Sequence, residues 1–139
     1  MPDRKFLSLL EESDHPLLAD GAMGTMLNTL GADLDGCFDE LNLTRPDMVA
    51  GVHRAYIEAG AQIIQTNTFG ANRYKLAHHG LEDRVAEINR AGVELARRAA
   101  SDSRQEIVIA GDVGPLGVRL APYGRVKPDQ ARQVFAEQI

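Results

Sequence analysis

Short apolar runs alternate along the chain with longer segments whose apolar residues recur at helical spacing. The runs typical of buried parallel strands are residues 16–21, 61–66 and 106–111. The helical segments are residues 46–60, residues 82–100, and a last one that begins at Pro128. A short helix is also expected within the first fifteen residues. Residues 22–45 show neither pattern, so they predict a long irregular connection.

The ends of the first long helix carry residues that favour helix boundaries. Pro46 suits the first helical position, because its missing N–H would have no partner there. Thr44 is the expected N-cap, and Gly60 is expected to end the helix. His53 lies on this helix, and we expect it at the protein surface.

Strands that alternate with helices predict an α/β fold with a parallel sheet and right-handed crossovers. The strand ends are evenly spaced, because 46 positions separate Asp20 from Thr66 and another 46 separate Thr66 from Asp112. All three runs end in small or polar residues. Ligands bind at this edge of parallel sheets, so we expect the functional residues there.

Composition narrows the function classes. The chain has 139 residues, 44% hydrophobic and 25% charged, which is typical of a globular domain. The net charge of -5 disfavours a nucleic-acid partner. No apolar run approaches the ~20 residues of a membrane span, and the N-terminus has no secretory h-region. Cys37 is the only cysteine, which suggests a reducing cytoplasm and excludes a multi-cysteine metal site within this chain.

The first candidate site follows the first strand. A carboxylate at Asp20 can hold an ammonium group, and the amides of Gly21 and Ala22 can approach a ligand carboxylate closely. A helix cap or a simple turn explains these residues equally well.

The second and third candidate sites follow the other two strands. Thr66, Asn67 and Thr68 are costly to bury unless they are paired, and Phe69 can form an apolar wall. The alternative is a polar network that only closes the strand. Asp112 and Gly114 lie in a glycine turn that is a structural turn or a site for a cation. The three segments converge on one edge, which favours function.

The remaining histidines and the cysteine are weaker evidence for a functional site than the three strand-end segments. His15, His78 and His79 are expected on the surface. Cys37 is expected to be a small packed residue, because a lone cysteine is more often that than a nucleophile or a ligand.

The order and spacing of five motifs resemble the homocysteine S-methyltransferase domain. This domain opens cobalamin-dependent methionine synthase and forms the N-terminal half of bifunctional proteins that add a methylenetetrahydrofolate reductase. The motifs are Leu18–Thr25, Glu40–Pro46, His53–Tyr56 with Ala59–Ala61, Ile64–Ala71 and Gly111–Pro115. The resemblance extends from about residue 15 to the end of the chain.

The resemblance implies a (β/α)8 TIM barrel, of which residues 1–139 are the N-terminal portion with about three βα units. It implies methyl transfer to the thiol of homocysteine, giving methionine, with zinc holding the thiol as the nucleophilic thiolate. It also implies that the substrate pocket includes residues from all three strand ends. These are Asp20, Gly21, Ala22, Thr66, Asn67, Thr68, Phe69, Asp112 and Gly114.

The sequence departs from the family pattern in its zinc ligands. The family uses three cysteines from late barrel strands, and Cys37 matches none of them. We therefore expect the zinc ligands beyond residue 139 and the barrel to end inside its third crossover helix. A barrel needs about 250 residues, so this chain alone is expected to be inactive and to associate through exposed sheet edges.

Several alternatives stay open at this point. The methyl donor can be methylated cobalamin, S-methylmethionine, a betaine-like compound or a folate. A non-catalytic module that binds an amino acid or assembles with a partner fits the Asp20 edge. Another TIM-barrel enzyme fits the fold pattern.

Overall fold

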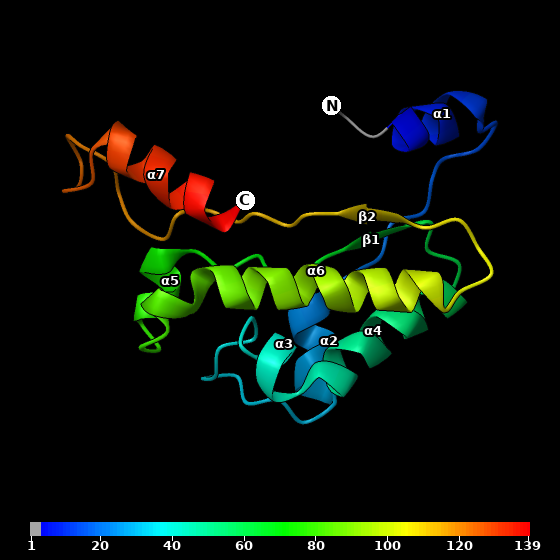
Figure 1. Ribbon diagram of the computed structural model, residues 1–139, viewed down its shortest axis with the longest axis horizontal. Coiled ribbons are helices and arrows are strands. Elements are labelled where there is room, and N and C mark those ends of the chain that lie inside the picture. Colours follow the sequence, from blue (N-terminus) through cyan, green and yellow to red (C-terminus); the bar gives the residue numbers. More distant parts are fainter. Residues whose placement is uncertain (1–3) are drawn as a thin grey trace.

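The computed structural model describes residues 4–139, whose helices pack mainly on one side of a small parallel sheet (Figure 1). The elements in chain order are α1 (Arg4–Glu12), α2 (Met23–Thr29), α3 (Leu41–Thr44), α4 (Pro46–Glu58), β1 (Ile63–Gln65), α5 (Arg73–Ala77), the 3-10 turn η1 (Glu82–Arg84), α6 (Val85–Ser101), β2 (Val108–Ala110) and α7 (Pro128–Gln138).

The second and third predicted strands form the sheet, but the first predicted strand is wrong. β1 and β2 run parallel, with Ile63 opposite Val108. Residues 16–21 contribute a single parallel bridge between Ala19 and Ile63. The ladder stops there because the backbone N–H of Gln65 donates to the carboxylate Oδ2 of Asp20, at 2.9 Å, in place of a backbone carbonyl.

The long helices follow the predicted pattern, whereas the predicted cap does not. α4 begins at Pro46 and ends before Gly60, which has φ of 103°. Thr44 does not cap α4, because Arg45 holds the cap position without a side-chain bond. Thr44 instead ends α3, and its Oγ1 bonds to the carbonyl of Glu40 at 3.3 Å.

The prediction that residues 22–45 are irregular is also wrong, because α2 and α3 lie within them. α2 buries Leu27 against Val49 and Val52 of α4 and Leu95 of α6. A third short helix, α5, follows β1 and begins where the side chain of Asn72 accepts hydrogen bonds from the next backbone amides. These short helices close the space around the strand ends.

α6 is the central support of the sheet. Ala96 and Ala99 pack with Ile57 of α4 and Ile64 of β1 in one buried cluster, so the strands rest on both long helices. Fully burying an isoleucine side chain such as that of Ile64 contributes roughly 1.5–3 kcal/mol to stability. The carboxyl ends of β1 and β2 are therefore held at fixed positions relative to each other.

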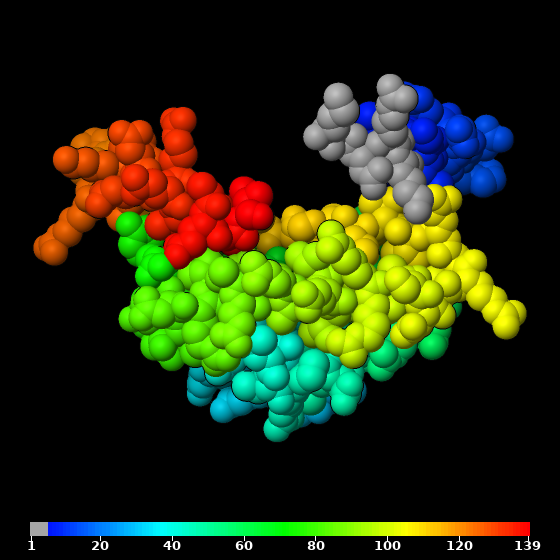
Figure 2. Space-filling model, in the orientation of Figure 1, coloured from blue at the N-terminus to red at the C-terminus, as the bar shows by residue number. Residues whose placement is uncertain are grey.

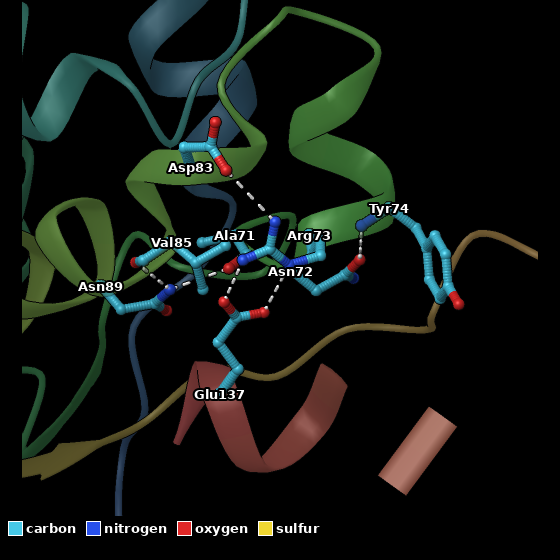
Figure 3. A network of polar contacts seen from close by, with 8 residues as sticks. All are labelled: Ala71, Asn72, Arg73, Tyr74, Asp83, Val85, Asn89 and Glu137. Carbon is cyan, nitrogen blue, oxygen red and sulfur yellow. Dashed lines mark hydrogen bonds and ion pairs between the residues drawn. The ribbon is translucent and has the colours of Figure 1, made fainter. Parts of the chain in front are cut away.

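α7 lies against α5 and is held there by polar contacts (Figure 3). Arg73 donates to both carboxylate oxygens of Glu137, and it also pairs with Asp83 at 3.4 Å. On the same helix, Nε2 of the buried Gln138 donates to the backbone carbonyl of Thr68 at 2.8 Å. The last helix therefore reaches the segment that follows β1.

The other side of the sheet is open. Figure 2 shows a hollow between α7 and α1, and the chain around β2 forms its floor. Within the described part of the chain, β2 pairs only with β1. Among the described helices, none combines the length and apolar character needed to cross a membrane.

Candidate functional site

Two threonines join the carboxyl ends of the strands. The hydroxyls of Thr66 and Thr68 lie 2.7 Å apart and both side chains are buried. Thr66 Oγ1 accepts a hydrogen bond from the backbone N–H of Asp112 at 3.0 Å. Thr68 Oγ1 donates to the backbone carbonyl of Asp112 at 2.8 Å. This threonine pair therefore ties the segment after β1 to the segment after β2.

Asn67 points away from the threonine pair, toward α3. Its Nδ2 donates to the carbonyl of Phe38 at 2.8 Å and to Oδ1 of Asn42 at 3.0 Å. Asn42 Nδ2 in turn donates to the carbonyl of Asn67 at 2.7 Å. Every one of these buried amide groups has a partner, so Asn67 fixes the loop before α3 against the strand end.

Asp20 lies where the first extended segment meets β1. Its carboxylate is half-buried and accepts from the backbone N–H of Gln65 at 2.9 Å and from Gln65 Nε2 at 3.2 Å. The following residues, Gly21 and Ala22, are exposed. Tyr56 of α4 donates its hydroxyl to the Ala22 carbonyl at 3.0 Å, and a Cβ on Gly21 would lie 2.9 Å from that hydroxyl. Gly21 is thus required for this close approach.

Phe69 and Gly114 bring the two strand-end segments into direct contact. The N–H of Gly114 donates to the carbonyl of Phe69 at 3.1 Å. A Cβ on Gly114 would overlap both that oxygen and the ring of Phe69. The ring is 52% exposed, so it borders the open side of the site as an apolar wall.

These segments enclose a cavity of about 260 Å³, which we call the strand-end cavity. Its lining residues are Met23, Gly24, Phe38, Asp39, Thr66, Asn67, Phe69, Gly70 and Asp112. Four of the predicted site residues are among them: Thr66, Asn67, Phe69 and Asp112. The other five lie outside the lining: Asp20, Gly21 and Ala22 just before it in the chain, Thr68 in the threonine pair, and Gly114 behind Phe69.

Asp39 is the one charged residue among the five lining residues that the sequence did not predict. Its Oδ1 accepts from the N–H of Gly70 at 2.9 Å, and a Cβ on Gly70 would lie 2.5 Å from the other carboxylate oxygen. The sequence gives little sign of this, because Asp39 lies in a long connection and at no strand end. The signal that it does give is an acidic residue beside Phe38 in a glycine-spaced loop.

Three carboxylates give the site a negative field. Burial raises the pKa of Asp112 above its ordinary value, and the nearby charge of Asp20 raises it further. Burial likewise raises the pKa of Asp39, with Asp112 adding to the rise. Lys75 opposes both shifts, because its positive charge favours the ionised carboxylates. A cation that entered the cavity would relieve the same repulsion.

His53 is buried, which overturns the expectation that it lies at the surface. Its side chain is 0% exposed, and neither ring nitrogen has a hydrogen-bond partner within the described structure. Burial lowers its pKa, and the negative charge of Asp20 works against that shift. His53 lies one turn after Val49 on α4, and Val49 packs in one buried cluster with Leu27 of α2 and Leu95 of α6.

Zinc does not fit the side chains that the structure describes. Cys37 is the only cysteine, and it is half-buried, with a thiol pKa that burial raises. A raised pKa favours the neutral thiol over the thiolate that binds metals. Among the described residues, no three His, Cys, Asp or Glu side chains gather as a metal site would require.

Comparison with known proteins shows which family the chain matches. The family model for homocysteine S-methyltransferase matches residues 17–139. Methionine synthase from Mycobacterium tuberculosis is 37% identical over an alignment of 135 residues, and the match covers 90% of this chain and 11% of that protein. Methionine synthase from Mycobacterium leprae is 35% identical over an alignment of 130 residues, and the match covers 87% of this chain and 11% of that protein.

A solved structure agrees with these matches. The homocysteine methyltransferase MmuM from Escherichia coli, in its metallated form, superimposes with a TM-score of 0.70 at 31% identity. The superposition covers 81% of this chain and 42% of that protein. The chain thus spans less than half of this solved relative and about a tenth of the two methionine synthases. With the family model matching nearly all of the chain, the protein belongs to the homocysteine S-methyltransferase family.

Proposed function

We propose that this chain forms the part of a homocysteine S-methyltransferase that binds the amino-acid end of homocysteine. The observation that carries the proposal is the acidic strand-end cavity in a member of this family. The reaction is transfer of a methyl group to the homocysteine thiol to give methionine. The architecture that we propose is the first three βα units of a (β/α)8 barrel, because the parallel pair β1–β2 and the bridge at Ala19 have the order that such units require.

The proposed role of the carboxylates is to hold the ammonium group of the substrate. The negative charge of Asp20 raises the pKa of Asp112, so a cation bound between these two carboxylates would relieve their repulsion. Asp39, which also lines the cavity, adds a third carboxylate. Charge-assisted hydrogen bonds to such groups are worth about 1.5–3 kcal/mol each.

The remaining predicted residues shape the pocket in this proposal. Gly21 and Ala22 give the substrate close access to the backbone, and Phe69 supplies an apolar wall for the methylene groups. Thr66, Thr68 and Gly114 hold the two strand ends in register, and Asn67 fixes the loop that carries Asp39. The chain thereby orients the substrate so that its thiol faces the methyl donor.

We propose that the zinc implied by the resemblance is held by ligands outside residues 1–139. The metal would keep the thiol in its nucleophilic form. None of the roles that we propose for the residues of this chain requires the metal. The methyl donor stays open among cobalamin, folate, S-methylmethionine and betaine-like compounds.

The test is a calorimetric titration of the intact protein with L-homocysteine. Asp20→Asn keeps an oxygen for the Gln65 amide but removes the charge, so we expect the Kd to rise about tenfold or more. Asp102→Asn, at the exposed end of α6, is the matched control and should leave the Kd unchanged. Methionine formation by the native gene product that carries the chain should fall in parallel. Equal affinity of both variants for homocysteine would refute the proposed site.

A further inference from the structure

The connection between β2 and α7 includes a segment with positive charges only. Residues 117–127, which we call the basic loop, contain Arg119, Arg125 and Lys127 and no acidic residue. All three residues are exposed, and none has an ion-pair partner among the side chains that the structure describes. Tyr123 lies between the two arginines in the sequence and is 86% exposed. The basic loop therefore presents an aromatic side chain flanked by cations.

Backbone contacts hold the basic loop in one compact turn. The N–H of Ala121 donates to the carbonyl of Val126 at 2.8 Å, and the N–H of Gly124 donates to the carbonyl of Leu120 at 2.9 Å. A Cβ on Gly124 would overlap the carbonyl oxygen of Arg119, so glycine is required for this close approach. Because the backbone is already ordered, binding of a partner would cost little conformational entropy in this loop.

A second exposed loop has the opposite charge. Residues 31–36, which we call the acidic loop, follow α2 and contain Asp33 and Asp35 as their only charged residues. The N–H of Asp35 donates to Asp33 Oδ1 at 3.1 Å, so this loop also forms a turn. Leu34 lies between the two aspartates and is 70% exposed. No lysine or arginine occurs among residues 6–44, so this part of the sequence carries no cation that neutralises the loop.

The two loops flank α5 at the same end of the molecule (Figure 1). Gly117 of the basic loop lies so near that a Cβ there would be 3.0 Å from Lys75 Cγ. Gly36 of the acidic loop lines a cavity of about 260 Å³ together with Lys75. Among the described residues, no ion pair joins the two loops. Each loop is therefore open to the complementary loop of another molecule.

We propose that the basic loop binds the acidic loop of a second copy of this protein. Because both loops lie at one end of the molecule, a two-fold axis in front of α5 brings each basic loop against the acidic loop of the other copy, and the contact occurs twice. In each contact the arginines meet the two aspartates, and Tyr123 packs against Leu34. Exposed ion pairs are individually weak and screened by salt, so the dimer is expected to be transient and salt-sensitive. The inference does not depend on the proposed function.

The first experiment changes the charges of the two loops in the intact protein. The basic-loop variant carries Arg119→Glu and Arg125→Glu. The acidic-loop variant carries Asp33→Asn and Asp35→Lys, where the asparagine keeps an oxygen for the N–H of residue 35. Each variant alone brings like charges together, so its Kd for self-association should rise about tenfold or more in sedimentation equilibrium.

A mixture of the two variants gives the decisive comparison. In the mixed dimer both contacts join opposite charges, so an equimolar mixture should associate about as strongly as the wild type. The matched control is Arg98→Glu with Arg104→Glu, which reverses two exposed arginines at and just beyond the C-terminal end of α6 and should leave the Kd unchanged. A mixture that associates no better than either variant alone would overturn the inference.

A second measurement uses only the wild-type protein and does not depend on the folding of any variant. Carbodiimide joins a carboxylate to an amine in direct contact, so it should link Lys127 to Asp33 or Asp35. In a mixture of unlabelled and heavy-isotope-labelled protein, mass spectrometry should find linked peptides that combine both labels. Raising the ionic strength from about 0.02 M to about 0.5 M should remove these links. A monomer at the lower ionic strength, or association that persists at the higher one, would also overturn the inference.

Discussion

His53 shows how one buried side chain makes stability depend on pH. Its pKa is lowered in the folded protein, whereas the unfolded chain has the ordinary histidine value of about 6.5. Below that value the unfolded state binds a proton that the folded state excludes. The contribution of His53 to stability is therefore complete at higher pH and is lost as the pH falls through about 6.5.

The first prediction follows from this sign. His53→Leu should flatten the fall in the free energy of unfolding between about pH 7.5 and about pH 5.5, measured by urea denaturation. His78→Gln is the control, because His78 is exposed. Asp39 and Asp112 act in the opposite direction, since carboxyl groups with raised pKa values bind protons in the folded state. They are common to all three proteins, so the difference between the curves isolates His53. Parallel curves for the wild type and His53→Leu would contradict the prediction.

Two helical glycines provide a matched pair at the scale of single elements. Gly92 on α6 is buried where a Cβ would lie 2.7 Å from Thr68 Cγ2 and 2.8 Å from Asn42 Nδ2. Gly51 on α4 has nothing within 4 Å of the same position. One glycine is thus required for packing and the other is not.

Substitution by alanine is expected to lower the free energy of unfolding at Gly92 but not at Gly51. Gly92→Ala should lower the free energy of unfolding by about 1–3 kcal/mol, because the methyl group forces α6 away from the strand-end segment. Gly51→Ala should leave it unchanged or raise it by up to about 1 kcal/mol through helix propensity. Chemical denaturation of both variants is the measurement, and a stabilised Gly92→Ala protein would show that α6 does not pack as described.

The elements differ in how well the sequence predicts them. α4 was predictable because Pro46 and Gly60 mark its ends with backbone chemistry that is local. α2 was not, because it is short, contains Gly24, and begins after Ala22 without a side-chain cap. Since α2 was missing from the prediction, the packing of its Leu27 on Val49 and Val52 of α4 was missing too.

The candidate site was predictable in part for an equally physical reason. Residues at strand ends follow from the strand pattern, so Thr66 and Asp112 could be assigned to one edge before the structure was known. The orientation of Asn67 depends on Asn42 in α3, a helix that the local pattern did not predict. Asp39 reaches the cavity from a connecting segment, and only tertiary packing brings it there.

The open edge of the sheet sets the behaviour of the whole molecule. Val108 and Asp112 direct their backbone N–H groups toward the β1 side, to the Gln62 carbonyl and to Thr66 Oγ1. Because N–H groups alternate in direction along a strand, those of Ile109 and Gly111 point the other way. Gly111 is exposed. Such an edge can pair with another strand.

The chain alone is therefore expected to associate with itself. Gly111→Lys places a charge on the edge at a position where a Cβ meets nothing within 4 Å, so it should reduce association. Ser101→Lys adds the same charge at the exposed end of α6 and should not. Sedimentation equilibrium over a range of concentrations gives the comparison. A purely monomeric wild-type chain would be inconsistent with an edge that pairs.

The threonine pair also determines whether the strand ends can donate hydrogen bonds to a ligand. Each hydroxyl carries one proton. The Thr68 hydroxyl donates its hydrogen bond to the Asp112 carbonyl, so the Thr66 hydroxyl must donate its own to Thr68 Oγ1. Neither hydroxyl has a proton left for a ligand, and the Asp112 amide is already engaged with Thr66. The part of the site next to the threonine pair can therefore accept hydrogen bonds from a ligand but cannot donate them. It suits a ligand group that donates several hydrogen bonds, such as an ammonium, and disfavours an anion, which only accepts them.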